Sequence, residues 1–324
     1  MYCAPRRVTC FWGVQNMKFA KPAISVDDQL ELLKQRGMTV PDEAHARHYL
    51  KHISYYRLRA YWLPFEGEKQ GDAHCFKDGT SFDDVLSLYV FDRQLRLLVM
   101  DAVEQVEVAI RASWAHHMAM SHGPHGYLDQ QHYSKVRHHA SMVDSLTKEF
   151  DRSRDTFAEH YRTKYTDPTL PPVWMAAELM SFGLLSKFYG GLKSRAERQA
   201  IAKPLGLDEK VLTSFAHHMS HVRNICAHHG RLWNRRFTIQ MIVPRYPARL
   251  AVAMKGADSR NIHNTLVTLD QMLRIIAPGT TWCDRVRALM ADCAFANPQA
   301  MGFPEGWEER TVWRVEGNKE GGAA

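Results

Sequence analysis

The sequence predicts an all-α protein, because it shows helical periodicity and helix caps and almost no strand pattern. Between residues 85 and 109 apolar residues recur at steps of three and four, which is the spacing of one face of an amphipathic helix. Ser81 and Asp84 have the spacing of a helix N-cap and its partner in the first turn. Only residues 237–243 are a candidate strand, and an extended connector suits them equally. We therefore expect helices almost throughout the chain.

The individual helices follow from caps, periodicity and breakers. Ser25 with Asp28 starts the first helix, and Gly37 stops it. The second begins after Asp42 and is expected to run unbroken to Trp62, since Pro64 ends it. The other helices are expected at 81–121, 133–165, 174–192, before Pro204, and at 207–229, 261–276 and 281–293.

The chain is expected to divide into five parts, which differ in periodicity and composition. These are an N-terminal extension, disordered or mis-annotated, at 1–16; an N-terminal helical module at 17–80; a central helical domain at 81–245; C-terminal helices at 246–300; and a flexible tail at 301–324. Translation is suspected to start at Met17.

Composition narrows the function classes. The 324 residues are 45% hydrophobic and 24% charged, as in globular proteins, and no apolar run approaches the roughly 20 residues that a membrane span needs. The six cysteines have no CxxC spacing and indicate a reducing cytoplasm. The formal charge of +7 favours a polyanionic partner. We expect a cytoplasmic protein that contacts no membrane.

Residues 221–236 hold the densest set of reactive side chains. Since a helix advances about 100° per residue, one stripe joins His217, His221, Asn224 and His228. Four apolar residues lie on the opposite face: Phe215, Met219, Val222 and Cys226. The histidine stripe is therefore expected to face outward, with Asn224 close enough to bond the His228 ring.

Arg223 adds a phosphate-binding group to this helix. A guanidinium beside an imidazole suits cleavage of a phosphodiester. Arg223 precedes His228 by five residues, or about 140° around the helix, so the two are not stacked neighbours. Either the arginine reaches round to a phosphate held by His228, or two such helices face each other across a two-fold axis and share a site.

Two other interpretations of the histidines stay open. His217 and His221 have the i, i+4 spacing of zinc-binding helices, but no glutamate or third ligand accompanies them, and we expect neither a metal nor a cofactor. The histidines could also simply cap and solvate a helix end, which by physics alone is about as good an explanation as catalysis.

A family resemblance favours catalysis. Arg223-Asn224-x3-His228 resembles the R-x4–6-H motif of the HEPN (higher eukaryotes and prokaryotes nucleotide-binding) superfamily, and residues 226–235 resemble the Abi-like family, bacterial abortive-infection proteins of the AbiD/AbiF kind. Further similar segments run in the same order over about 17–245: 21–22, 27–37, 48–50, 53–58, 61–62, 91–96, 172–174 and 180–183.

The resemblance implies a HEPN-like helical bundle with additional N-terminal and C-terminal helices, and a metal-independent endoribonuclease that acts as a toxin in antiviral defence. Arg223 would bind the scissile phosphate, His228 would transfer a proton as the ribose 2′-hydroxyl attacks, and Asn224 would orient the site. His229 and His221 are supporting candidates. One such motif per chain implies a homodimer, and a 2′,3′-cyclic phosphate product implies RNA as substrate.

Basic residues outside the motif are candidate RNA contacts. Arg231, Arg235 and Arg236 follow the motif helix, and Arg57 and Arg59 lie among aromatic residues. Tyr56 and Trp62 are expected in the core. The charged residues Glu104, Glu107 and Arg111 are expected on a solvated helix face, with support of the motif helix as the alternative.

Two functions without catalysis stay open. One is an RNA-binding or regulatory HEPN module, and the other is an adaptor or antitoxin-like subunit whose histidines form an interface. Whether or not the chain is catalytic, a regulatory RNA or an antitoxin is a further candidate partner.

Overall fold

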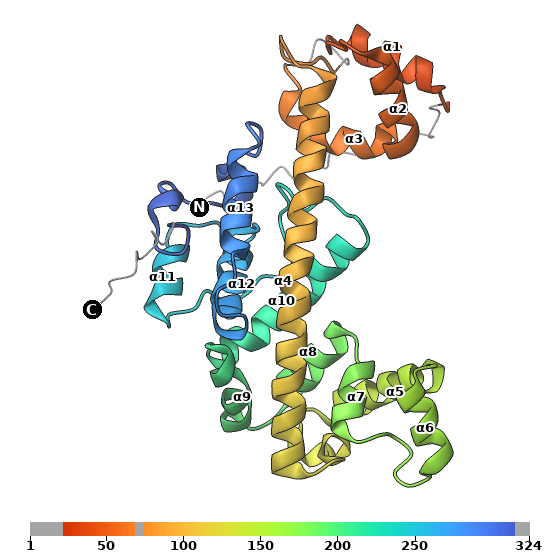
Figure 1. Ribbon diagram of the computed structural model, residues 1–324, viewed down its shortest axis with the longest axis vertical. Helices are drawn as coiled ribbons and strands as arrows, with labels where there is room; N and C mark the ends of the chain where they lie inside the picture. Colours follow the sequence, from red (N-terminus) through yellow and green to blue (C-terminus); the bar gives the residue numbers. More distant parts are fainter. Residues whose placement is uncertain (1–21, 69–73, 315–324) are drawn as a thin grey trace, which may run out of the picture. The chain divides into compact units, whose positions relative to one another are not determined.

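The computed structural model describes residues 22–68 and 74–314, and every regular element in these ranges is helical (Figure 1). The α-helices are α1 Val26–Gln35, α2 Glu43–Ile53, α3 Tyr55–Trp62, α4 Phe82–His122, α5 Val136–Arg152, α6 Thr156–Lys164, α7 Val173–Leu179, α8 Phe182–Gly191, α9 Arg195–Ala202, α10 Glu209–Ala227, α11 Ala248–Met254, α12 His263–Ile276 and α13 Trp282–Ala291. The all-α prediction is confirmed. The expected extension at 1–16 and the end of the expected tail, from 315 on, lie outside the described residues.

The described ranges also hold six short 3₁₀ turns, four between these helices and two after α13. They are η1 Leu63–Phe65, η2 Gly126–Leu128, η3 Gln130–His132, η4 Lys203–Leu205, η5 Gln299–Met301 and η6 Trp307–Glu309. Residues 237–243 form no strand and run as an irregular connector. Their position is fixed from α10, since Ser214 Oγ accepts a hydrogen bond from the Ile242 amide at 2.9 Å.

The chain divides into two compact units, one ending at Asp83 and the other beginning at Asp84. In the first unit, Ser25 and Asp28 form the expected capping box at the start of α1. The single helix expected at 42–62 is wrong, because the chain breaks at Ser54 with a φ of 76°. The Ser54 hydroxyl then accepts the Arg57 amide and caps α3. Thus Ser54 is both the C-cap of α2 and the N-cap of α3.

The aromatic prediction for α3 is half right. Trp62 is buried, but Tyr56 is 85% exposed. The two side chains differ because residues 58, 61 and 62 take the buried side of this eight-residue helix. Tyr56 leaves that side and faces solvent.

In the second unit, α10 packs against α8 and α9, and α5 packs against α7 and α8. A Cβ placed on Gly190 would lie 3.0 Å from Cγ2 of Thr213, so the glycine allows α8 and α10 to approach closely. The single helix expected at 174–192 is also wrong. It is interrupted at Met180 and Ser181, where the Ser181 hydroxyl caps α8 by accepting the Leu184 amide.

Charged residues on α4 hold this break in place. Arg111 is buried and donates to the carbonyls of Ala177 and Met180, and its guanidinium also pairs with Glu107 at 2.7 Å. The prediction of a solvated face is therefore wrong for Arg111, while Glu104 is exposed as expected. The arginine satisfies carbonyls that the end of α7 leaves without helical partners.

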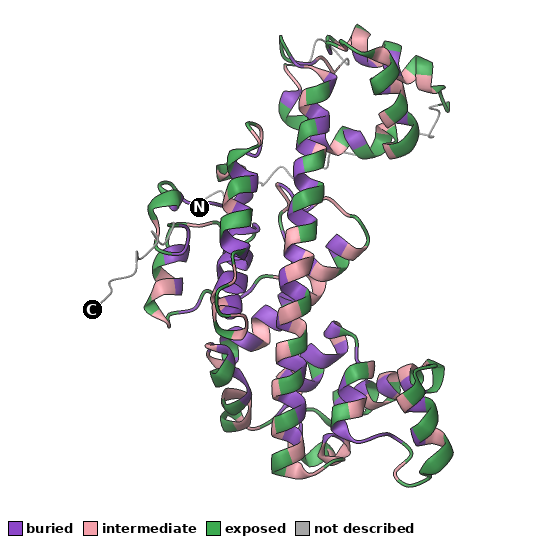
Figure 2. Ribbon diagram, in the orientation of Figure 1, coloured by how far each residue is buried: buried purple, intermediate pink, exposed green. Residues whose placement is uncertain are grey.

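The C-terminal helices form the rest of the second unit. Helix α12 is buried along most of its length, which Figure 2 shows as an almost continuous purple helix. Helix α11 was not expected, because its seven residues are too few to show a helical period. Residues 301–314 are packed, with Trp313 fully buried and donating to His263 Nε2 at 3.3 Å, so the flexible tail expected from residue 301 does not begin there.

Within the described ranges, no helix is both long enough and apolar enough to cross a membrane.

Candidate functional site

Helix α10 has the two faces that its sequence predicts. Phe215, Met219, Val222 and Cys226 are buried. On the other face, His217, Asn224 and His228 are exposed and His221 is half-buried. The apolar stripe thus holds α10 in the second unit and leaves the polar stripe accessible.

The helix ends just before the histidine pair. His228 is its C-cap, and His229 follows with a left-handed φ of 57°. The Gly230 amide donates to the Ile225 carbonyl at 2.8 Å, and the His229 amide donates to the Cys226 carbonyl at 3.0 Å. These two bonds form a Schellman motif, in which the left-handed position is usually occupied by glycine. His229 therefore adopts a backbone conformation that is unfavourable for residues with a Cβ atom.

A buried ion pair from α4 fixes the turn that follows. Asp92 is fully buried and pairs with Arg96. Asp92 Oδ1 also accepts the amides of Leu232 and Trp233, at 3.1 and 2.6 Å. Arg96 Nη1 lies 3.5 Å from the Gly230 carbonyl oxygen. The chain leaving α10 is therefore anchored to α4 by a carboxylate and a guanidinium.

The proposed catalytic trio sits directly before this anchor. Arg223 is half-buried and its Nη1 lies 3.5 Å from Asn224 Oδ1, a long contact. The expected bond from Asn224 to the His228 ring is not formed, although the His228 amide does donate to the Asn224 carbonyl at 3.0 Å. The reason is that Asn224 turns its oxygen toward Arg223. Asn224 therefore contacts the arginine and not the imidazole.

The surroundings of His221 favour its neutral form by lowering the pKa of the ring. Burial lowers its pKa, and the positive charge of Arg235 and the neighbouring His217 lower it further. Its ring also meets the edge of Phe237, with centroids 6.5 Å apart. An imidazole kept neutral can accept a proton at physiological pH. Arg235 supplies one of the charges, and donates to the Arg231 carbonyl at 3.3 Å.

The other basic candidates differ in their surroundings. The Arg231 guanidinium lies 5.8 Å from the Trp233 ring centroid. Arg236 is exposed and pairs with Asp258 at 3.5 Å. Arg57 and Arg59 are exposed on α3, which belongs to the first unit. The structure thus gathers Arg231 and Arg235 near the motif, while Arg57 and Arg59 belong to a separate unit.

His218 is a histidine with a different role from its neighbours. It is buried, its Nδ1 lies 2.6 Å from the Ile239 carbonyl oxygen, and its Nε2 lies 2.8 Å from Thr265 Oγ1. Burial lowers its pKa to about 4. His218 therefore ties α10 to the connector and to α12 as a neutral side chain.

The roles of Asp92 and His218 could have been predicted from the sequence but were not. Asp92 follows Leu88 by four residues and precedes Leu95 by three, so it lies in the apolar stripe of α4. An acidic residue in that stripe indicates a buried partner. His218 lies beside the exposed His217 in sequence but about 100° around the helix, toward the buried face. Among the described residues, no three His, Cys, Asp or Glu side chains are grouped as a metal site requires.

Comparison with known proteins adds one finding. The sequence profile of a family described as Abi-like protein matches residues 48–234, more than half of the chain. This range contains α3 to α10, both residues of the Asp92–Arg96 pair, and the whole histidine stripe. Neither a curated protein nor a solved structure gives a significant match.

Proposed function

Because this chain belongs to the Abi-like protein family, we propose that it is an abortive-infection effector that cleaves RNA, with Arg223 and His228 as its catalytic residues. Membership of the family implies a role in abortive-infection defence against phage. The finer part of the proposal is the nuclease chemistry. One observation carries it: an arginine and an accessible histidine lie at the end of α10, beside a turn that is hydrogen-bonded to a buried ion pair.

The chemistry follows from the side chains present. His228 would take the proton from a ribose 2′-hydroxyl, whose oxygen then attacks the adjacent phosphorus. Arg223 would neutralise the charge that develops on the phosphate oxygens. The bond from phosphorus to the 5′-oxygen breaks, that oxygen takes up a proton, and the products are a 2′,3′-cyclic phosphate and a 5′-hydroxyl. This route involves no metal ion.

The proton for the leaving oxygen needs a second donor. His229 adjoins His228, and His221 lies on the same stripe. A second copy of the chain would supply another His228. The offset of about 140° between Arg223 and His228 supports a site shared by two copies, since a phosphate between two α10 ends can meet the arginine of one and the histidine of the other. We therefore propose a homodimer.

The test is cleavage of end-labelled single-stranded RNA by the purified chain in the presence of a chelator. We expect products that end in a 2′,3′-cyclic phosphate, and no cleavage where the scissile ribose is 2′-deoxy. His228→Ala and Arg223→Ala should each lower the rate by about 10²-fold or more. His160→Ala and Arg154→Ala, which remove exposed side chains away from α10, should cleave at the unaltered rate.

Other outcomes would redirect the proposal. RNA that binds with strong salt dependence, and binds equally to His228→Ala without being cut, would identify a non-catalytic RNA-binding module. Cleavage that survives both Arg223→Ala and His228→Ala would place the active site elsewhere. Mixing Arg223→Ala with His228→Ala tests the dimer, because activity returns only if the two copies share a site.

A further inference from the structure

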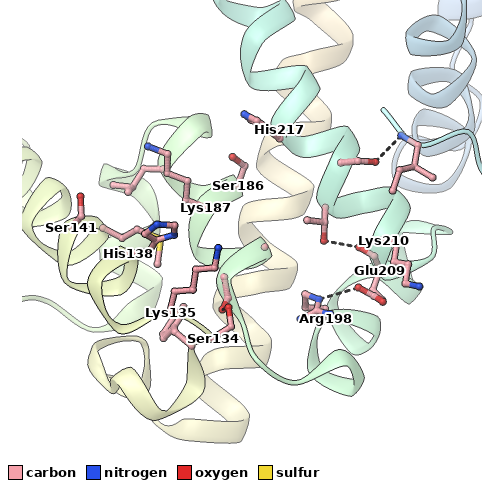
Figure 3. Close-up of a pocket in the computed structure, with 18 of the residues that line it drawn as sticks. Ser134, Lys135, His138, Ser141, Ser186, Lys187, Arg198, Glu209, Lys210 and His217 are labelled. Carbon is pink, nitrogen blue, oxygen red and sulfur yellow. Dashed lines mark hydrogen bonds and ion pairs between the residues drawn. The ribbon is translucent and has the colours of Figure 1, made fainter. Parts of the chain in front are cut away.

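A cavity of about 830 Å³ lies beside the N-terminal half of α10. Its lining comes from the start of α5, from α8, α9 and α10, and from the connector at 237–243, and Figure 3 shows labelled side chains of the four helices around one space. Its volume is in the range of pockets that hold a small organic ligand and exceeds what a bare anion needs. None of the catalytic or RNA-binding residues expected from the sequence lines it. His217, which belongs to the histidine stripe of α10, does line it.

The cavity is strongly cationic. Four permanent cations line it: Lys135, Lys187, Lys210 and Arg198. Its one carboxylate, Glu209, is buried and already paired with Arg198 at 2.9 Å and Arg195 at 3.2 Å. The three lysines are exposed and have no ion pair among the described residues. The free positive charge thus exceeds what the lining can neutralise, which favours an anionic ligand.

The start of α5 adds a second, independent preference for an anion. Helix α5 has 17 residues, and its N-cap, Lys135, makes no side-chain cap. No acidic residue lies in its first turn, where acidic side chains are usual. Ser134, Lys135 and His138 line the cavity, so the start of this helix lies at its wall. Phosphate groups bind at such helix ends.

The remaining lining suits the rest of a nucleotide. Met142, Leu184 and Ile242 supply an apolar surface of the kind a base or ribose can cover. Tyr133 also lines the cavity, and its hydroxyl is buried without a hydrogen-bond partner in the described ranges. A buried hydroxyl with no partner is costly, and a polar ligand group would satisfy it once the Tyr133 side chain turns toward the cavity.

From the charge, the helix start and the mixed lining, we propose that this cavity binds a nucleotide, with its phosphate at the lysines and the start of α5. The same chemistry is present in a free nucleotide and in one unit of an RNA strand. Lys210, Ser214, His217, His221 and His228 follow one face of α10, so a strand could pass from the cavity to the histidines. The site does not depend on cleavage chemistry, and its test does not measure cleavage.

The test compares two double charge reversals in the full-length chain. Lys187→Glu with Lys210→Glu removes two cations of the cavity, whereas Lys203→Glu with Lys255→Glu makes the same change in net charge at exposed lysines outside it. The probes are ATP, inorganic phosphate, and a 2′-O-methylated single-stranded RNA that cannot be cut. Binding is measured by calorimetry, and folding by circular dichroism.

Each outcome decides the proposal. We expect the cavity variant to lose affinity for at least one nucleotide probe by about tenfold or more, while the outside variant keeps it. Loss of ATP binding identifies a free nucleotide as the ligand, and loss of RNA binding alone identifies an RNA strand. Binding of phosphate with no gain from the rest of ATP would reduce the site to an anion site and overturn the proposal. So would equal affinities in the two variants, or no binding by the unaltered chain, whatever the result of the cleavage tests.

Discussion

The two ends of α10 are each fixed by a buried carboxylate, but in opposite ways. At the N-terminal end the carboxylate is Glu209 of α10 itself, and its partners Arg195 and Arg198 reach toward solvent. At the C-terminal end the carboxylate is Asp92 of α4, whose partner Arg96 is buried and whose oxygen also accepts two amides of the loop. One end is held by side chains at the surface, and the other by a polar cluster inside the protein.

This difference suits the two functions we propose. A binding cavity tolerates some adjustment of its walls, so cations that remain partly hydrated are sufficient to hold it. A catalytic turn needs its groups within a fraction of an ångström, which a fully buried carboxylate that accepts backbone amides provides. Removing each carboxylate in turn tests this difference between the two ends.

The largest effect is expected from Asp92→Ala. It leaves Arg96 buried without its partner and the amides of Leu232 and Trp233 without an acceptor. Loss of one member of a buried ion pair costs about 3–5 kcal/mol. Urea unfolding should show this loss, with cleavage reduced in parallel as the turn loosens. Asp144→Ala is the control, because its pair with Lys148 is exposed and should change stability by less than about 1 kcal/mol.

A double variant separates the effect of leaving Arg96 without Asp92 from the effect of removing the acceptor of the two loop amides. Replacing both Asp92 and Arg96 by leucine and methionine removes the unpaired charge but still deprives the two loop amides of their acceptor. Stability should therefore recover in part and cleavage should not. A recovery of both would show that the pair does not position the turn.

Glu209→Ala should cost less than Asp92→Ala although both carboxylates are buried. Arg195 and Arg198 keep 69% and 20% of their side chains exposed, so water can solvate them once the carboxylate is gone. We expect a loss of about 2–3 kcal/mol in urea unfolding, with cleavage retained. A loss as large as that of Asp92→Ala would contradict the contrast between the two ends.

The middle of α10 should respond to acid. The pKa of His218 is lowered to about 4 by burial, against about 6.5 for a histidine in an unfolded chain. Between these values the unfolded state binds the proton more readily. The contribution of the buried, neutral His218 ring to stability is therefore complete above about pH 6.5 and is lost as the pH falls toward 4. From pH 7 to pH 5 this amounts to about 2 kcal/mol.

Urea unfolding at pH 7, 6 and 5 measures that slope. His218→Gln should be less stable at pH 7 but should lose about 2 kcal/mol less on acidification. His160→Gln, which alters an exposed histidine, should keep the original slope. Part of the slope will survive in His218→Gln, because burial also lowers the pKa of His263 to about 4. If the unfolding free energy of His218→Gln kept the original pH dependence, His218 would not be its cause.

The sequence predicted the helices whose period is long and missed what depends on single contacts. Periodicity was sufficient for α4, α10 and α12, where three or more turns repeat. It failed at Ser54 and Ser181, where a hydroxyl caps a new helix inside an apolar run. The motif arginine and histidine could be named by spacing and resemblance. The cavity could not, because its lysines come from segments about 20 to 75 residues apart, and only packing brings them together.

The smallest effect, and the most selective, is expected at His229. A side chain in the left-handed conformation costs about 1 kcal/mol, and glycine avoids this cost. His229→Gly should therefore raise stability by up to about 1 kcal/mol, whereas His229→Ala keeps the strained backbone. Both lose the imidazole. If His229 donates the proton to the leaving oxygen, both variants should cleave more slowly by the same factor, one of them in a more stable protein. Cleavage that falls in His229→Ala and is normal in His229→Gly would instead assign the residue to the shape of the turn, and would leave the second proton donor to His221 or to His228 of another copy.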